Sequence, residues 1–439
     1  NGNCGLSAAP LYGKAKDHRE NDLREAGIRE RWNTLDEYFR ILSERKPALN
    51  IASLVGHGNI RASVMGFEDR DPSRDEMEQM RTLLAEAVRN GAIGLSTGLI
   101  YPPGVYARTG EIIALARSIK GLLYTSHMRS EGDELIEAIE ETVNIGRKSG
   151  IAVHISHLKT GGKKNWHKIE NAISVIEEAQ DEGIQVTCDR YPYTAASTDL
   201  DAVLPAWVYA GGAEEELKRL GDRGVRSTIR NELLTRHMDD DYWGSITISS
   251  ILSESHTWME GRTLLDISSS IGKDPIEFLF DILVAERLRI GAIFYSMDEG
   301  NLRRFLSLPY LVIGSDSSAR STNGPTRKGK PHPRGFGTFP RFLGRYVRDG
   351  RMMSISEGIH KMTMLPAQIF GLRQRGRIQE NCYADLVIFD EQKIVDRATF
   401  EEPFLLPDGV SSVFVNGLPV LLEGRPTGMT PGRVLRHGE

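Results

Sequence analysis

The 439-residue sequence predicts an α/β protein whose larger part is a (β/α)8 barrel, followed by a small β-rich unit. Two observations carry this prediction. Helical segments alternate with short apolar runs that end in polar residues, and the repeat is close to the roughly 31 residues that one βα unit of such a barrel occupies. From about Gly376 the alternation stops, and short β-rich runs with turns such as Asn416-Gly417 follow.

The composition is that of an ordinary globular protein, with 40% hydrophobic and 26% charged residues. The net charge of −5 is spread along the chain, without a basic stripe for nucleic acid or an apolar run of the roughly 20 residues that span a bilayer. We therefore expect a small-molecule partner, and neither nucleic acid nor membrane. The cysteines Cys4, Cys188 and Cys382 are odd in number and far apart, which favours a reducing compartment, by default the cytoplasm.

The predicted helices share one design. "SRDEMEQMRTLLAEAVRNGAIGLSTG" opens with a capping box of Ser73 and Glu76, carries apolar residues at helical spacing, stops near Gly91 and enters an apolar run. "GDELIEAIEETVNIGRKSG" and "HKIENAISVIEEAQDEG" repeat the plan and stop at Gly150 and Gly183. Alternation of helices and apolar runs of this length indicates a parallel sheet.

Polar residues at the ends of the apolar runs recur in phase. Thr97, His127 and His157 are each 30 residues apart, and Asp189 follows 32 residues later. A doubly wound sheet would also fit the alternation. The barrel is favoured because the carboxyl ends of all its strands open into one mouth, where such residues would meet.

The strand ends counted in this way are seven: Cys4, His57, Thr97, His127, His157, Asp189 and Asp316. A closed barrel needs eight strands, so we expect the first strand upstream of Asn1, since the sequence begins without Met and inside an element. The alternative is a strand hidden in residues 200–305, which read as an insertion. The expected domains are a barrel over 1–372 and a β unit over 373–439.

Three residues suggest a metal site. His127 in "YTSHMR" and His157 in "HISHLK" each follow a serine at the ends of neighbouring strands, so they can converge on one ion. Cys4 in "GNCG" adds a thiolate, and Gly2 and Gly5 allow the sharp backbone turn that brings its sulfur inward. Zinc accepts a Cys-His-His set, which leaves a position open for catalysis. The alternative is two hydrogen-bonded core histidines and an ordinary buried cysteine.

Further candidates lie at the same predicted rim. Asp316 in "VIGSDSS" ends an apolar strand, and beside a metal it could accept and return a proton; alternatively it is a turn or cap aspartate. Lys159, Tyr191 and Arg334 would together suit a substrate carboxylate. For Lys159 and Arg334 taken separately, a surface cation is the plainer interpretation.

Eight stretches carry a resemblance to a known family: "GNCG", "GAIGLSTGLIYPPG", "SHMRSEGDEL", "ISHLK", "DRYPYTA", "GSDS", "HPRGFGTFPRFLG" and "MTMLPAQIFGL". Through essentially its whole length the sequence resembles the N-acyl-D-amino-acid deacylases (D-aminoacylases) of the amidohydrolase superfamily. The resemblance implies a zinc-dependent (β/α)8 barrel, a small β-sandwich built from both chain ends, and hydrolysis of the amide of N-acyl-D-amino acids. A non-catalytic barrel that serves as a binding scaffold is the alternative from another class.

The resemblance also assigns residues by position. The family's metal ligands match Cys4, His127 and His157, and its catalytic aspartate matches Asp316. Its carboxylate clamp matches Lys159, Tyr191 and Arg334, and Tyr101 in "LIYPPG" matches a pocket position near the substrate side chain.

The sequence departs from the family in two places. The His-x-His pair of the first strand, which a second metal would need, is absent, and the loop before Arg334 is longer than expected. Cyclic-amide hydrolases of the dihydroorotase or hydantoinase kind, the nearest rival, carry a carboxylated lysine on the fourth strand, where this chain has "AIGLSTG". No cation is evidently placed for an acidic substrate side chain, which favours neutral or apolar D-amino acids.

Overall fold

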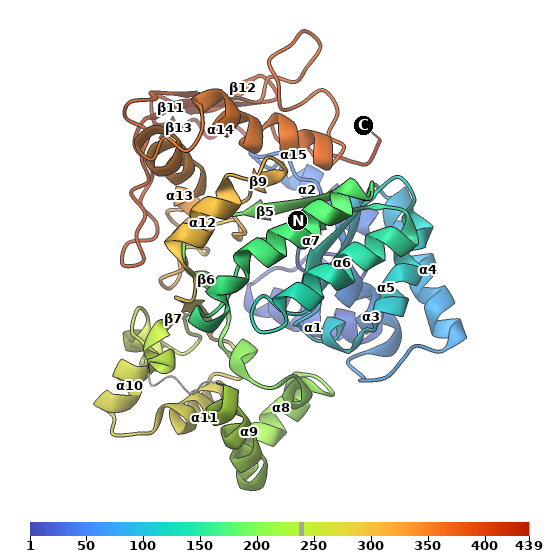
Figure 1. Cartoon of the computed structure of the whole chain (residues 1–439), viewed down its shortest axis with the longest axis vertical. Helices are drawn as coiled ribbons and strands as arrows, with labels where there is room; N and C mark the ends of the chain where they lie inside the picture. The colour runs from blue at the N-terminus through green and yellow to red at the C-terminus, as the bar shows by residue number, and fades with distance from the viewer. Residues whose placement is uncertain (237–240, 439) are drawn as a thin grey trace.

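The frame of the protein is a six-stranded parallel sheet, seen in a computed structural model that describes residues 1–236 and 241–438 (Figure 1). Its strands, in spatial order, are β1 (Val55–Gly56), β2 (Gly94–Gly98), β3 (Leu123–His127), β4 (Ala152–Ile155), β5 (Val186–Arg190) and β9 (Leu311–Ile313). Since every neighbouring pair is parallel, the carboxyl ends of these strands share one edge. The predicted strand ends at Thr97, His127, His157 and Asp189 all fall within two residues of that edge.

Helices alternate with the strands. They are α3 (His57–Met65), α4 (Arg74–Arg89), α5 (Thr109–Ala116), α6 (Leu135–Ser149), α7 (Ile169–Asp181) and α12 (Glu299–Leu306). Of these helices, α4, α6 and α7 were predicted from the sequence. The capping box of α4 is formed, with the Glu76 amide donating to Ser73 Oγ at 3.3 Å, and α6 ends at Gly150, whose φ is +74°. The apolar faces of α4, α6 and α7 are buried in one core with the sheet. Two further helices, α1 (Gly13–Glu25) and α2 (Leu35–Arg45), precede β1.

The N-terminal residues lie alongside β1, and the strand expected upstream of Asn1 stays a prediction. Residues 1–12 contain no strand, and Cys4 lies in a turn beside β1. The stretch is nevertheless fixed to β1 and α3, because the Leu54 amide donates to the Asn1 carbonyl at 2.9 Å and the Gly58 amide to the Gly5 carbonyl at 2.8 Å. Gly2 and Gly5 have φ values of +81° and +79°, which no extended strand contains.

Between β5 and β9 the chain forms a separate unit, in the lower part of Figure 1. Its antiparallel sheet has the order β6 (Ala196–Asp199), β8 (Gly291–Phe294), β7 (Ile246–Ser250). Around the sheet lie α8 (Ala213–Gly221), α9 (Arg223–Arg236), α10 (Leu264–Ser270) and α11 (Pro275–Ala285), with an apolar core of their own. This is the region expected to be an insertion, whose boundaries near 200 and 305 stay predictions.

After β9 come α13 (Arg334–Arg341), the π-helical segment Phe342–Asp349, α14 (Ile355–Met362) and α15 (Met364–Ile369). An antiparallel sheet follows, of β10 (Leu386–Phe389), β11 (Val410–Val415), β12 (Leu418–Leu422) and β13 (Arg425–Pro426). Asn416 and Gly417, both with positive φ, join β11 to β12 as predicted. The chain then returns to the start of the parallel sheet, where Ile51 pairs with Val434. The boundary at 372/373 stays a prediction.

Short 3₁₀ helices complete the described elements: η1 (Gly104–Tyr106), η2 (Arg117–Ile119), η3 (Lys163–Lys168), η4 (Leu200–Val203), η5 (Ala206–Tyr209), η6 (Tyr242–Ser245) and η7 (Glu254–Met259). Among the helices of the described residues, none combines the length and the apolar character that crossing a lipid bilayer requires.

Candidate metal centre

Three possible metal ligands from distant parts of the chain meet at the carboxyl edge of the parallel sheet. His127 is the last residue of β3, His157 lies two residues beyond β4, and Cys4 comes from the N-terminal turn. The Cys4 sulfur is 3.4 Å from His157 Nε2, and the rings of His127 and His157 have their centroids 4.4 Å apart. One donor atom from each of the three residues lies within 4.8 Å of the other two.

The backbone around the three residues explains the convergence. His157 has a left-handed φ of +40°, and its amide donates to Asp189 Oδ1 at 2.9 Å, which turns the chain sharply after β4. The Cys4 turn packs directly on the end of β2 at Gly98, which has no side chain. A Cβ atom added at Gly98 would overlap the Cys4 backbone. Glycine at this position therefore lets the sulfur approach the two histidines.

The chemistry of the three residues fits a metal ion. His127 is buried, and neither of its ring nitrogens has a hydrogen-bond partner among the described residues. Burial holds the pKa of His127 well below its ordinary value, so the ring is in the neutral form that binds metals. Buried polar atoms are normally paired, and a metal would supply the missing partner. A thiolate with two imidazoles is a donor set that zinc accepts.

Asp316, Arg334 and Tyr191 lie together. Asp316 follows β9 with a left-handed φ of +47°, and its Oδ2 is 2.9 Å from an Arg334 Nη atom. The Arg334 guanidinium lies over the Tyr191 ring, 4.6 Å from the centroid. Burial acts to raise the pKa of the Tyr191 hydroxyl, but the cations Lys159, Arg190 and Arg334 outweigh it and the pKa is lowered. An anionic group is therefore favoured in this part of the site.

Lys159 is buried beside His157, and its ammonium forms an ion pair with Glu131, a residue that the sequence reasoning missed. Glu131 Oε1 is also 2.7 Å from His157 Nδ1. Burial acts to raise the pKa of Glu131, but Lys159 and the two histidines hold it well below the usual range. The one signal in the sequence is its place in "SHMRSEGDEL", four residues after His127.

Tyr101 connects the site to the unit inserted between β5 and β9. Its ring centroid is 5.0 Å from that of His127, and its hydroxyl is 2.9 Å from Thr198 Oγ1 on β6. Burial is the largest cause that raises the pKa of the Tyr101 hydroxyl well above the ordinary value, and the nearby Cys4 is the next largest. An Nη atom of Arg334 approaches the carbonyl of Ser197, also on β6, at 3.4 Å. Strand β6 therefore contacts two of the predicted substrate-binding residues.

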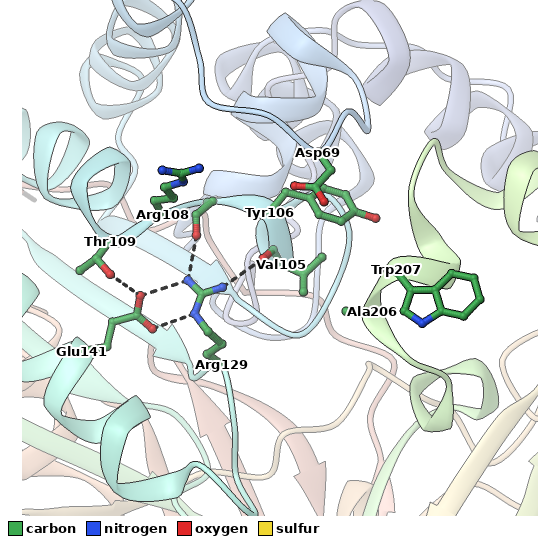
Figure 2. A pocket seen from close by; sticks show the side chains of 10 residues that line it. Asp69, Val105, Tyr106, Arg108, Thr109, Arg129, Glu141, Ala206 and Trp207 are labelled. Atoms are coloured by element: carbon green, nitrogen blue, oxygen red, sulfur yellow. Dashed lines mark hydrogen bonds and ion pairs between the residues drawn. The ribbon is translucent and has the colours of Figure 1, made fainter. Parts of the chain in front are cut away.

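A cleft of about 550 Å³ is lined by Val105, Tyr106 and Arg129, among other residues (Figure 2). The side chains around it in Figure 2 include Arg129, which follows His127 by two residues. Its guanidinium donates to the carbonyls of Val105 and Ala107 at 3.0 and 2.8 Å and forms an ion pair with Glu141. Arg129 thereby ties the loop after Tyr101 to the end of β3.

Comparison with known proteins places the chain in a family. The sequence profile described as "Amidohydrolase family" matches residues 13–421. A D-aminoacylase of Alcaligenes xylosoxydans xylosoxydans is 36% identical over 436 residues, 99% of this chain and 80% of the relative. An N-acyl-D-glutamate deacylase of the same organism is 35% identical over 439 residues, 99% of this chain and 79% of the relative.

A solved structure agrees with these relatives. It is an N-acyl-D-glutamate deacylase from Bordetella bronchiseptica, in complex with zinc and a phosphonate inhibitor that mimics the tetrahedral intermediate of the reaction. It is 33% identical, with a TM-score of 0.80 over 99% of this chain and 81% of that chain. The chain therefore belongs to the amidohydrolase family, and the predicted fold class is confirmed. Within that family it belongs with the N-acyl-D-amino-acid deacylases, as the eight motifs predicted.

Proposed function

We propose that this protein is a zinc-dependent hydrolase of linear amides that converts N-acyl-D-amino acids into a carboxylate and a free D-amino acid. The observation that carries the proposal is the convergence of Cys4, His127 and His157, with the ring nitrogens of His127 unpartnered in the described structure. These three residues would hold the ion. The D-aminoacylase and N-acyl-D-glutamate deacylase relatives, alike over nearly the whole chain, support the reaction.

When bound, zinc supplies a Lewis acid that polarises a carbonyl and lowers the pKa of water to about 7. Asp316 accepts the proton that water loses as it attacks the amide carbon, and then returns it to the leaving nitrogen. Its carboxylate lies within electrostatic reach of His157, and the contact of Oδ2 with Arg334 at 2.9 Å fixes its position.

The substrate carboxylate would lie among Arg334, Lys159 and Tyr191. A guanidinium offers five donors, so Arg334 can keep its contact with Asp316 and still bind a second carboxylate. Because the carboxylate and the acyl group are then held at separate points, the side chain of only one enantiomer points toward Tyr101. We propose that this arrangement selects D-amino acids.

For the substrate side chain we propose neutral or apolar groups. Tyr101, the predicted pocket residue, contacts the His127 ring and the Thr198 hydroxyl, and neither is a cation that could pair with an acidic side chain. A second carboxylate on the substrate would therefore be held beside Tyr101 without an ionic partner there. Comparison of kcat/KM for N-acetyl-D-methionine and N-acetyl-D-glutamate tests the preference, and a higher value for the glutamate derivative would contradict it.

The main test combines elemental analysis with hydrolysis assays on N-acetyl-D- and N-acetyl-L-amino acids. Cys4→Ala should lose zinc, and full zinc occupancy in that variant would remove Cys4 from the site. Asp316→Asn should keep its zinc and lower kcat by about 10²- to 10⁴-fold. Near-normal turnover in Asp316→Asn would refute the proton-transfer role.

The alternative functions give different results in the same assays. A cyclic-amide hydrolase of the hydantoinase kind would open hydantoin rings, but β2, the strand expected to carry its lysine, reads "GLSTG". A binding scaffold would hydrolyse neither substrate class. A cytoplasmic location remains part of the proposal and is supported by Cys4, Cys188 and Cys382, none of which forms a disulfide in the described chain.

A further inference from the structure

The two ring nitrogens of His157 face different neighbours. Nε2 faces the other two possible ligands, with the Cys4 sulfur at 3.4 Å. Nδ1 faces away from them, toward the Lys159 ammonium at 2.9 Å and Glu131 Oε1 at 2.7 Å. If His157 holds a metal together with Cys4 and His127, it does so through Nε2.

Binding through Nε2 fixes where the ring proton must be. The Nε2 lone pair has to be free, so the neutral imidazole carries its hydrogen on Nδ1. An ammonium has three donors and no acceptor, so Lys159 cannot accept from this N–H. Glu131 Oε1, at 2.7 Å, can. If Lys159 donated into Nδ1 instead, the hydrogen would lie on Nε2, pointing at Cys4 and blocking the metal.

We infer that Glu131 is a positioning residue that sets the tautomer of His157 and so presents Nε2 to the metal. The inference rests on the zinc site of the proposed function. The Glu131 carboxylate also pairs with the Lys159 ammonium, and this pairing keeps the ammonium from donating to His157 Nδ1. A carboxylate behind a ligating histidine orients the ring and raises its basicity, and the loss of such a partner typically weakens metal binding 10- to 100-fold.

The surroundings of Glu131 suit this role. Its side chain is only 19% exposed, and its carbonyl accepts from the Gly161 amide at 2.6 Å, so the loop after β3 is fixed to the loop after β4. These are the loops that follow His127 and His157. Glu131 therefore joins the metal site to the predicted carboxylate clamp through Lys159.

The test measures the zinc dissociation constant of the full chain by competition with a chromogenic chelator. Glu131→Gln should bind zinc about 10- to 100-fold more weakly than the wild type. Glu134→Gln, an exposed glutamate on the same loop, is the matched control and should bind as the wild type does. Lys159→Met keeps the Glu131–His157 contact, so it should retain zinc while KM rises.

A second measurement reads the tautomer itself. Zinc-free protein labelled with ¹⁵N-histidine, measured at a pH where the His157 ring is neutral, should show its hydrogen on Nδ1 in the wild type and shifted toward Nε2 in Glu131→Gln. Unchanged zinc affinity and an unchanged tautomer in this variant, folded by circular dichroism, would overturn the inference. If Glu131→Gln does not fold, Glu131→Asp takes its place, because the shorter side chain keeps the charge but withdraws it from Nδ1. Unchanged zinc affinity and an unchanged tautomer in Glu131→Asp would then overturn the inference.

The outcomes separate this inference from the proposed function. Weakened zinc binding in Glu131→Gln without any hydrolysis of N-acyl-D-amino acids by the wild type would leave the inference standing and the function refuted. Hydrolysis by the wild type, with no effect of Glu131→Gln on zinc affinity or on the His157 tautomer, would leave the proposed function standing and refute the inference. Loss of zinc from Lys159→Met to the same degree would also overturn the inference, because Glu131 would then act through Lys159.

Discussion

Gly98 offers a test of how closely the Cys4 turn must pack on the sheet. Gly98 is the last residue of β2, and its backbone conformation is one that alanine adopts without strain. A methyl group there would lie 2.9 Å from the carbonyl carbon of Cys4 and 2.9 Å from Cδ2 of Tyr101, and closer still to the Cys4 oxygen. Gly98→Ala therefore changes the space that β2 shares with the N-terminal turn and the Tyr101 ring.

The magnitude follows from that overlap. Carbon atoms in contact normally lie about 3.5–4.0 Å apart, so the Cys4 turn would have to move by at least about 0.6 Å. The atom in the way belongs to the backbone and cannot rotate aside, and such overpacking costs about 1–3 kcal/mol. A displacement approaching 1 Å at a reactive site lowers the rate by about 10²-fold. We expect Gly98→Ala to weaken zinc binding by at least tenfold and to lower kcat/KM by about 10²-fold.

The assay pairs zinc affinity with urea unfolding of the zinc-free chain. Gly110→Ala is the control: no atom lies within 4 Å of the added methyl group, and alanine in α5 should raise the free energy of unfolding by about 0.5–1 kcal/mol. If Gly98→Ala binds zinc and turns over substrate as Gly110→Ala does, the close packing of the Cys4 turn on β2 plays no part in the site, and the reasoning fails.

Three further predictions concern other parts of the molecule. Glu111→Gln removes the buried partner of Arg61 and His57 and should lower the free energy of unfolding by about 3–5 kcal/mol in urea titrations. Burial acts to raise the pKa of Glu111, but His57 and Arg61 lower it more, so the pKa in the folded protein lies below the ordinary glutamate value of about 4.3. The stabilisation by the ionised Glu111 carboxylate is therefore complete above pH about 4.3. It is lost as the pH falls through the pKa of Glu111 in the folded protein. Removal of zinc by a chelator should lower the melting temperature, and added zinc should restore it in a thermal-shift assay. Arg129→Lys should raise KM in steady-state kinetics and leave zinc affinity unchanged, because a lysine cannot hold Val105, Ala107 and Glu141 together.

Much of the fold could be predicted from the sequence because strand ends and helix stops recur in phase. Thr97, His127 and Asp189 lie where the interval of about 31 residues puts them, at the carboxyl edge of the sheet. At Cys4 the flanking glycines indicated a sharp backbone turn, and the left-handed φ values of Gly2 and Gly5 confirm it.

The meeting of Cys4, His127 and His157 could be predicted because parallel strands bring their ends to one edge. The contacts of Glu131 could not. Its position in a polar stretch with neighbouring charged residues is typical of a solvated loop, and its burial depends on the packing of two loops that begin about 30 residues apart. Periodicity locates strand ends, but it does not determine which loop side chains fold inward.

The residues that would do the chemistry share a feature that periodicity cannot reveal. His157 and Asp316 are both non-glycine residues with left-handed φ, at +40° and +47°, two and three residues after the parallel strands β4 and β9. Such conformations cost about 1–3 kcal/mol each and persist only where the surroundings hold them. At His157 the Asp189 carboxylate binds the amide, and at Asp316 Arg334 binds the side chain. At each of these positions the chain turns sharply at the sheet edge. The His157 imidazole after β4 and the Asp316 carboxylate after β9 therefore lie within electrostatic reach of each other. Asp and His are among the few non-glycine residue types that tolerate such turns, so the two positions combine a permitted backbone conformation with the side chains that the site needs.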